Sequence, residues 1–379
     1  MIYLDNGATS FPKPPSVSEA VRYAMRTYAA NAGRGSHRMS VMAAEALWRA
    51  RERLSQLFGI PKPERLVFTL NCTDSLNMGL LGLLNAGDDL IISDMEHNSV
   101  YRPAVALKEK GVRTLFAESD AAGMVSMESV RQQITPRTRL ICLQHASNVG
   151  GGINPIREIG EMAHENGILF MVDAAQTAGC VPIDVEKDHI DILAFPGHKG
   201  LLGPQGTGGL YVREGITLRP LRRGGTGSAS ESAEMPSFLP DRLESGTQNL
   251  PGIAGLSEST AWILKTGVPR ILQHERMLLK RMMDKVYGMR GVTVLGPRDI
   301  SKRTGVLSLA FDGKEPTEIA DVLDKRYGIA VRAGLHCAPL AAKRFGILET
   351  GSLRFSPGVF NLPRDIDYAM HALRESLFR

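Results

Sequence analysis

Cysteine is scarce in this sequence: four residues, at positions 72, 142, 180 and 337, in a chain of 379. They form no CxxC pair and no ligand-like cluster with histidine, so we expect no structural zinc site and no other metal site. Four cysteines are also too few to hold a chain of this length together by disulfides. Free thiols in a reducing, cytoplasmic setting are the simplest interpretation.

Long hydrophobic runs are also lacking. No apolar stretch reaches the roughly 18 residues of a membrane helix, and the start, MIYLDNGATSFPKPP, lacks the layout of a signal peptide. The net charge is +5, but the densest basic clusters are only the pairs Arg222–Arg223 and Lys325–Arg326. We therefore expect no membrane and no nucleic-acid partner; anionic small molecules explain the positive charge better.

The composition is that of a folded protein, with 43% hydrophobic and 22% charged residues. Between about 40 and 213, helix-like and strand-like segments alternate. The apolar spacing of 42–58 predicts a helix, and short apolar runs predict strands at 65–70, 89–95, 112–118, 138–146, 168–175, 191–196 and 208–213. Strands that are apolar on both faces and separated by helices, such as 155–166, indicate an α/β fold with a mostly parallel sheet. Such a sheet binds ligands at the carboxyl ends of its strands.

The second half of the chain has another pattern. Residues 214–250 are rich in Gly, Ser and Pro and predict a long loop, and 252–289 is mainly helical. Strands at 292–296, 305–311, 329–334 and 352–356, with helices at 316–327 and from 363, predict a smaller α+β unit. We therefore expect a large α/β domain at 15–255 and a small α+β domain at 256–379, which residues 1–14 join.

Lys199 is the first candidate for chemistry. It follows an apolar strand and lies among Gly197, Gly200 and Gly203, which let the backbone approach a ligand closely. A lysine in such a place is desolvated and loses basicity, as Schiff-base chemistry requires. A surface lysine in a turn is the alternative.

Asp173 supports the chemical interpretation. It ends the apolar run ILFMVDAAQ, where an unpaired carboxylate is costly. A cationic ring nitrogen would pair with it, and pyridoxal phosphate needs such a partner to keep its pyridine nitrogen protonated. A carboxylate that only caps the next helix is the alternative.

Two further segments follow predicted strands. NCTDSLNMGL (71–80) opens a helix whose N-terminus, with Cys72 and Thr73, favours a phosphate, although hydroxyl-rich helix starts are also plain N-caps. His97, in SDMEHNS, is placed to stack on a flat heterocycle and to shuttle protons. A buried structural histidine is the alternative.

An ordered set of motifs runs through the chain: CT (72–73), EHN (96–98), SN (147–148), DAAQ (173–176) and GHK (197–199). With YLDNGATS near the start, NAGRGSHRMS (31–40), ESGTQN (244–249), RAGLHCAP (332–339) and SLRFSPGVFN (352–361), the set resembles the class V aminotransferase group of fold-type I pyridoxal-phosphate enzymes. Within that group it is similar to the cysteine desulfurases, and around RAGLHCAP to the group II (Suf-like) enzymes and selenocysteine lyases. The resemblance extends from residue 3 to about 361.

The resemblance implies a role for each matching residue. Lys199 would form the Schiff base with pyridoxal 5'-phosphate, Asp173 would bind the pyridine nitrogen, Gln176 would bind the phenolic oxygen, and His97 would stack on the ring. The phosphate would be held by Thr73, His198, the backbone near Cys72, and Thr247 of a second subunit, which implies a homodimer. Arg354 would clamp the substrate carboxylate. Asn148 would lie beside cofactor and substrate, and Arg34, His37 and Arg332 match further pocket positions.

In the same resemblance Cys337 is the nucleophile. It would take sulfur from L-cysteine, leaving L-alanine and a persulfide for an acceptor protein that the sequence does not name. Its neighbours Arg332 and His336 would favour the thiolate. A buried, inert thiol is the alternative, and it is the state we expect of Cys142 and Cys180.

Other functions stay open at this point. A selenocysteine lyase, a cysteine-sulfinate lyase, an epimerase or an aminotransferase of the same group would keep the cofactor and change the reaction. A non-enzymatic binding protein on an enzyme fold is a third class. Two departures from the family pattern, a flexible glycine run at 150–152 and the loop 222–237, concern the substrate and the sulfur acceptor more than the cofactor.

Overall fold

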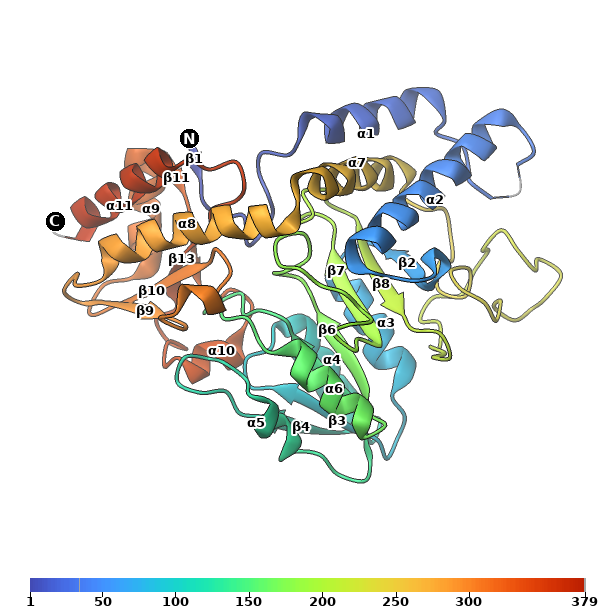
Figure 1. Cartoon of the computed structure of the whole chain (residues 1–379), viewed down its shortest axis with the longest axis horizontal. Helices are drawn as coiled ribbons and strands as arrows, with labels where there is room; N and C mark the ends of the chain where they lie inside the picture. The colour runs from blue at the N-terminus through green and yellow to red at the C-terminus, as the bar shows by residue number, and fades with distance from the viewer. Residues whose placement is uncertain (34, 378–379) are drawn as a thin grey trace.

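The computed structural model describes residues 1–33 and 35–377. A seven-stranded sheet forms the centre of the larger part (Figure 1), with the strand order β2-β8-β7-β6-β5-β3-β4. Its strands are β2 (Leu66–Thr69), β3 (Asp89–Ser93), β4 (Arg113–Ala117), β5 (Thr138–Gln144), β6 (Leu169–Asp173), β7 (Ile192–Pro196) and β8 (Gly208–Val212). Strand β8 runs opposite to the other six strands, which confirms the predicted mostly parallel sheet.

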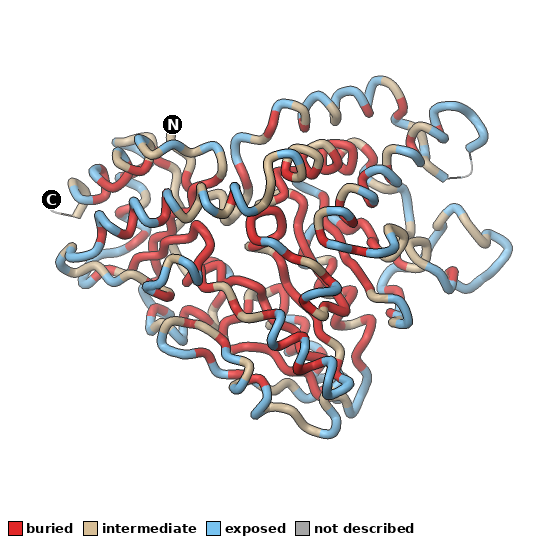
Figure 2. The backbone as a smooth tube through the Cα atoms, in the orientation of Figure 1, coloured by how far each residue is buried: buried red, intermediate tan, exposed pale blue. Residues whose placement is uncertain are grey.

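Helices cover both faces of this sheet. They are α1 (Pro15–Thr27), α2 (Arg38–Phe58), α3 (Cys72–Leu83), α4 (Asn98–Lys108), α5 (Met127–Arg131), α6 (Ile156–Glu165) and α7 (Leu250–Thr266), with a short 3-10 turn, η1 (Pro63–Arg65). Alternate strand residues belong to different hydrophobic clusters, since Phe170 and Val172 face α2, α6 and α7 while Met171 faces α3 and α4. Figure 2 shows that the backbone at the centre of the molecule is mostly buried.

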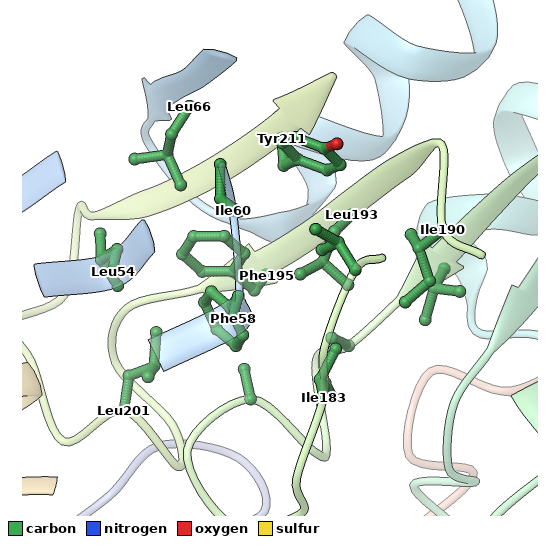
Figure 3. Packing of buried hydrophobic residues seen from close by; sticks show 14 of the residues in the cluster. Leu54, Phe58, Ile60, Leu66, Ile183, Ile190, Leu193, Phe195, Leu201 and Tyr211 are labelled. Carbon is green, nitrogen blue, oxygen red and sulfur yellow. The ribbon is translucent and has the colours of Figure 1, made fainter. Parts of the chain in front are cut away.

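One of these clusters fixes α2 against β7 (Figure 3). The rings of Phe58, at the end of α2, and Phe195, in β7, lie 4.8 Å apart between centroids, and both are buried. Gly59 then adopts a left-handed conformation with φ +65°, which ends the helix as the sequence predicts. Because β7 leads directly to Lys199, this packing sets the position of that lysine.

The smaller part contains a four-stranded antiparallel sheet in the order β12-β13-β10-β9. Its elements are α8 (Val268–Val286), β9 (Val292–Leu295), η2 (Ile300–Lys302), β10 (Leu307–Phe311), α9 (Pro316–Tyr327), β11 (Ile329–Ala330), β12 (Arg332–Gly334), α10 (Pro339–Arg344), β13 (Ser352–Phe355) and α11 (Pro363–Leu377). The predicted strand at 329–334 is therefore two short strands. The predicted helical stretch 252–289 is interrupted at Gly267 (φ +90°), between α7 and α8.

The N-terminal segment connects the two parts. Strand β1 (Ile2–Tyr3) pairs in parallel with β11, and Asp5 bridges to Ser356. A few residues later the N–H of Ser10 donates to the carbonyl of His198, 2.9 Å away. The boundary expected at 255 falls inside α7, which packs on α1 and α2. We propose to place the division between the domains at Gly267.

Two further observations concern the sequence predictions. Residues 213–249 contain no helix or strand, as expected of a long loop. The glycine run 150–152, by contrast, is buried and tightly packed: a Cβ on Gly152 would lie 2.5 Å from the sulfur of Met124. The expectation of a flexible run was wrong, because these glycines let the loop approach its neighbours closely.

Among the described residues, no helix has both the length and the apolar character that crossing a membrane requires.

Candidate active site

The predicted cofactor residues meet at the carboxyl ends of the parallel strands. Asp173 is the last residue of β6, Lys199 lies three residues beyond β7, and His97 follows β3. They line one cavity at this edge of the sheet. The predicted residues that line it are Cys72, Thr73, His97, Asn148, Asp173, Gln176, His198 and Lys199.

Lys199 and Asp173 form the electrostatic centre of this cavity. Burial lowers the pKa of the Lys199 amine, and the charge of Asp173 opposes that shift. Burial raises the pKa of Asp173, while the backbone N–H of Ala175, 2.8 Å from Oδ1, and Lys199 oppose it. The cavity thus holds a lysine of reduced basicity and a carboxylate that forms no ion pair with any described residue. The glycines around Lys199 serve protein packing, because a Cβ on Gly197 or Gly200 would meet Thr207 Oγ1 at 2.1 Å or the Ala178 carbonyl at 2.5 Å.

His97 lies on the wall of the cavity and caps α4. Its Nδ1 accepts a hydrogen bond from the N–H of Ser99 at 3.1 Å. Burial, followed by the charge of Lys199, lowers the pKa of His97 to about 4. The ring is therefore neutral near pH 7, and since Nδ1 accepts, the ring proton is on Nε2. A neutral ring can stack on a flat ligand without a charge penalty.

The N-terminus of α3 forms one end of the cavity. Cys72 and Thr73 are its first residues, and Asn71 caps it by accepting from the N–H of Asp74 at 3.0 Å. The free backbone N–H groups of a first helical turn favour an anion, and Thr73 adds an exposed hydroxyl. His198 lines the same cavity; its Nδ1 lies 3.1 Å from Thr9 Oγ1, and burial lowers its pKa to about 4.

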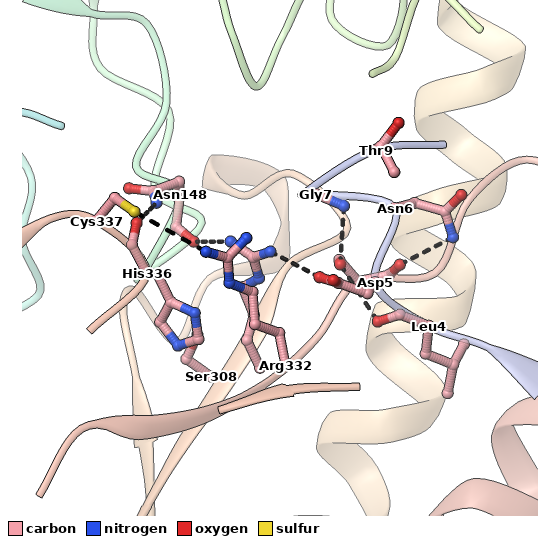
Figure 4. A network of polar contacts seen from close by, with 12 residues as sticks. Leu4, Asp5, Asn6, Gly7, Thr9, Asn148, Ser308, Arg332, His336 and Cys337 are labelled. Carbon is pink, nitrogen blue, oxygen red and sulfur yellow. Dashed lines mark hydrogen bonds and ion pairs between the residues drawn. The ribbon is translucent and has the colours of Figure 1, made fainter. Parts of the chain in front are cut away.

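Arg354, in β13, is buried beside the cavity. Its Nη2 pairs with Asp5 Oδ1 at 2.8 Å, its Nη1 donates to the carbonyl of Asn148 at 3.1 Å, and its Nε has no partner among the described residues. Asn148 donates from Nδ2 to the carbonyl of His336 at 2.7 Å, while its buried Oδ1 is also unpartnered. In Figure 4, Asn148 lies beside His336 and Cys337, whereas Asp5 lies on the opposite side, next to Gly7 on the N-terminal segment. Asp5 lies in the YLDNGATS motif, but the motif alone predicts no role for it.

Cys337 is exposed and lies in a strained turn. His336 and Cys337 both have positive φ, +53° and +56°, which is unfavourable for residues other than glycine. The turn is held from outside: the N–H of Asn98, next to His97, donates to the Cys337 carbonyl at 2.8 Å. Arg332 Nη2 lies 3.9 Å from the Cys337 sulfur. The backbone of the predicted nucleophile is thus tied to Asn98, whose neighbours His97 and Ser99 line the cavity; Cys337 itself is not among the lining residues. Cys142 and Cys180 are buried, as expected.

The expectation that His336 favours the thiolate was wrong. Its ring is buried and its Nε2 interacts with Ser352 Oγ at 3.0 Å. Burial, with a contribution from Arg354 and Arg332, lowers the pKa of His336 to about 3, so the ring carries no charge near pH 7. Among the two predicted neighbours only Arg332 offers a positive charge to Cys337.

Some predicted residues are not in this cavity. Thr247 is exposed and lines a separate cavity together with Trp48 and Gly225. His37 is exposed and caps α2 by accepting from the N–H of Ser40. Arg34 lies outside the described residues. Gln176 does line the cavity, but its Nε2 already donates to the Gly7 carbonyl at 3.1 Å.

The donor set fits pyridoxal phosphate. An amine of reduced basicity suits an aldehyde carbon, a buried carboxylate suits a pyridinium nitrogen, and a helix N-terminus suits a phosphate. All three face one cavity, with a neutral imidazole on its wall. In the described part of the chain, no group of three or more His, Cys, Asp or Glu side chains is arranged to hold a metal ion.

Comparison with known proteins gives consistent matches. The family model of the class-V aminotransferases matches residues 2–369. The chain is 34% identical to a "probable cysteine desulfurase" of Methanothermobacter thermautotrophicus and 35% identical to one of Pyrococcus abyssi, in each case over 99% of this chain and 94% of the relative. Among solved structures it is similar to an apo cysteine desulfurase of Thermococcus onnurineus, with a TM-score of 0.92, 35% identity and coverage of 99% and 94% of the two chains. The cysteine desulfurase CsdA of Escherichia coli gives 0.88, 29%, and the same coverage.

Proposed function

Because this chain belongs to the class-V aminotransferase family of pyridoxal-phosphate enzymes, we propose that it is a cysteine desulfurase that stores sulfur on Cys337. The reaction removes sulfur from L-cysteine and leaves L-alanine. The observation that carries the proposal is the convergence of Lys199 and Asp173 in one cavity. The exposed Cys337 is tied by its backbone to Asn98, between two residues that line this cavity.

When bound, pyridoxal phosphate supplies an electron sink that weakens the bonds at the substrate's α and β carbons. In our proposal Lys199 holds the cofactor and afterwards moves the proton at the substrate Cα, for which its lowered pKa suits it. Asp173 holds the ring nitrogen, His97 packs on the ring, and the start of α3 with Thr73 and His198 holds the phosphate. Gln176 would donate its second Nε2 hydrogen to the phenolic oxygen of the cofactor.

Arg354 is the proposed ligand of the substrate carboxylate, with Asn148 and Arg332 beside it. A guanidinium with an unpaired N–H suits a planar carboxylate. The Cys337 thiolate attacks the substrate sulfur: an S–S bond forms, the C–S bond breaks, and its electron pair stays on the carbon, which takes a proton. The net products are L-alanine and a Cys337 persulfide, so no external oxidant or reductant is needed.

We further propose that the enzyme acts as a homodimer, which would bring the partner subunit's Thr247 to the phosphate. Its exposed position, outside the cavity of its own chain, supports this proposal. The exposed thiol of Cys337 suits transfer to an acceptor protein at the surface. The four cysteines are free, which supports a reducing, cytoplasmic setting.

The test is mass spectrometry of the cofactor-loaded protein after incubation with L-cysteine, together with measurement of alanine. We expect a mass gain of one sulfur on the peptide that contains Cys337. Cys337→Ala should lose it and keep the cofactor's visible absorbance, and Cys180→Ala, a buried thiol, is the matched control. Unchanged alanine release by Cys337→Ala would contradict the proposed sulfur route. Alanine from selenocysteine or cysteine sulfinate, but not from L-cysteine, would instead assign the chain to a lyase of the same family.

A further inference from the structure

We infer that Cys72 is a positioning residue: its thiol donates a hydrogen bond to Asp173 and so sets how much negative charge this carboxylate offers to the cofactor's ring nitrogen. Nothing in the family pattern assigns this role to the side chain at position 72. The inference rests on the proposed function for its meaning, although its geometry does not depend on a bound cofactor.

The geometry is specific. Cys72 is the first residue of α3 and is buried, and its sulfur lies 3.3 Å from Oδ1 of Asp173, within the range of sulfur hydrogen bonds. The same Oδ1 accepts from the N–H of Ala175. The other oxygen, Oδ2, makes no hydrogen bond with any described residue, and Asp173 lines the cavity. The two donors on Oδ1 therefore orient the carboxylate and leave Oδ2 for a ligand.

The direction of the hydrogen bond follows from the surroundings. Burial, and then the negative charge of Asp173, raise the pKa of the Cys72 thiol, so the sulfur keeps its proton and donates it. A thiol is a weaker donor than a hydroxyl. Cys72 thus withdraws less charge from Asp173 than a serine or threonine hydroxyl would, and more than an alanine would.

A purely packing role is the alternative, and Cys142 provides the comparison. It is also fully buried and lies in β5, and burial, followed by the charges of Glu96 and Asp173, raises its pKa. Its thiol makes no hydrogen bond with any described residue. If only packing matters, removing either sulfur should affect the cofactor site in a similar way.

The test is a pH titration of the visible absorbance of the cofactor-loaded protein for wild type, Cys72→Ala, Cys72→Ser and Cys142→Ala. The titration measures the pH midpoint for protonation of the Schiff base between Lys199 and the cofactor. More negative charge on Asp173 offsets the positive ring nitrogen better and therefore raises this midpoint. Since a thiol is a weak donor and only part of its effect on Asp173 is felt at the bond between Lys199 and the cofactor, we expect shifts of about half a pH unit. The midpoint should rise in Cys72→Ala, fall in Cys72→Ser and stay unchanged in Cys142→Ala. Shifts of Ala and Ser in the same direction, or no shift in either, would overturn the inference.

A second measurement uses the protein without cofactor. The Raman S–H stretching band that disappears in Cys72→Ala belongs to this thiol. We expect that band to move to higher frequency in Asp173→Asn, because a neutral amide oxygen is a weaker acceptor than a carboxylate. A band that does not move rules out the hydrogen bond, even if a Cys72 variant fails to bind the cofactor. A wild-type protein that never acquires visible absorbance would refute the cofactor assignment and leave this result standing.

Discussion

The charged residues of the site take their partners from distant parts of the chain. Arg354 pairs with Asp5, Asp173 accepts from Cys72, and the Cys337 turn is held by Asn98. The sequence motifs point to Arg354, Cys337, Asp173 and Cys72, but they assign no role to Asp5 or Asn98 and reveal none of the three pairings. A spacing pattern reports neighbours within a helix or strand, and contacts across 349 or 101 residues depend on how the whole chain folds.

Asp5 provides the first prediction at this scale. The side chain of Arg354 is 2% exposed and that of Asp5 20%, so Asp5→Asn leaves an almost buried guanidinium without its counter-charge. We expect the free energy of unfolding to fall by about 1–3 kcal/mol, below the range of fully buried pairs because Asp5 is partly hydrated. L-Alanine, whose carboxylate can pair with Arg354, should restore part of the loss. Denaturant unfolding of the loaded protein with and without L-alanine measures this.

The matched control is Asp284→Asn, which removes an exposed ion pair with Lys280 whose side chains are 59% and 62% exposed. It should change stability by no more than about 0.5 kcal/mol and should not respond to L-alanine. An equally small effect of Asp5→Asn would show that the ion pair with Arg354 does not stabilise the protein in the absence of L-alanine.

Buried histidines give a prediction about pH. Burial lowers the pKa of His145 to about 3, whereas in the unfolded chain it is about 6.5. Between these values the unfolded state binds one more proton than the native state, so stability is full above pH 6.5 and falls as the pH decreases. By pH 5 this residue alone should cost about 2 kcal/mol. His145→Asn should flatten the decline between pH 6.5 and 5 in denaturant unfolding, and exposed His371→Asn should leave it as in wild type. Parallel declines for His145→Asn and wild type would contradict this explanation.

At the scale of elements, the sequence predicted the central strands to within about two residues. The inner strands β3, β6 and β7 are buried on both faces, and a continuous apolar run bounded by turns is a direct consequence of that burial. Helix α1 was not predicted, because it buries only Val17 and Ala24 and its pattern is mostly polar. The sequence predicts a flexible glycine run at 150–152, because glycine marks both conformational freedom and close packing and only the tertiary structure distinguishes them.

The glycine run gives the prediction at this scale. Gly151 has φ +70°, and a Cβ there would lie 2.9 Å from the carbonyl of Val306; Gly167 has φ +65° and nothing within 4 Å of such a Cβ. Alanine at either position adds left-handed strain of about 1 kcal/mol, and at Gly151 it also forces the two segments apart at about 1–3 kcal/mol. Gly151→Ala should therefore destabilise the protein more than Gly167→Ala in parallel denaturant unfolding. Equal losses would mean that the loop after Asn148 is not closely packed.

At the scale of the whole molecule, the first ten residues join the two parts around the site. Residues of β1 pair with the smaller part, Asp5 reaches Arg354, and Thr9 and Ser10 contact His198 beside Lys199. The proposed carboxylate ligand and the proposed Schiff-base lysine are thus linked through one short segment. The sequence predicts that residues 1–14 join the small domain, but their hydrogen bonds connect them to both parts of the molecule.

Thr247 gives the prediction for the assembled enzyme. If each site combines Lys199 of one subunit with the partner subunit's Thr247, a mixed dimer of Lys199→Ala and Thr247→Val has one site without its lysine and one complete site. Each variant alone should be defective: the first forms no covalent cofactor link, and the second binds the phosphate weakly. After unfolding and joint refolding of equal amounts, about one quarter of all sites should be complete, since about half of the dimers are mixed and each has one complete site of two. Alanine release at limiting pyridoxal phosphate measures this, with each variant refolded alone as the control. If the mixture only matches the average of the two controls, Thr247 does not act across a subunit boundary.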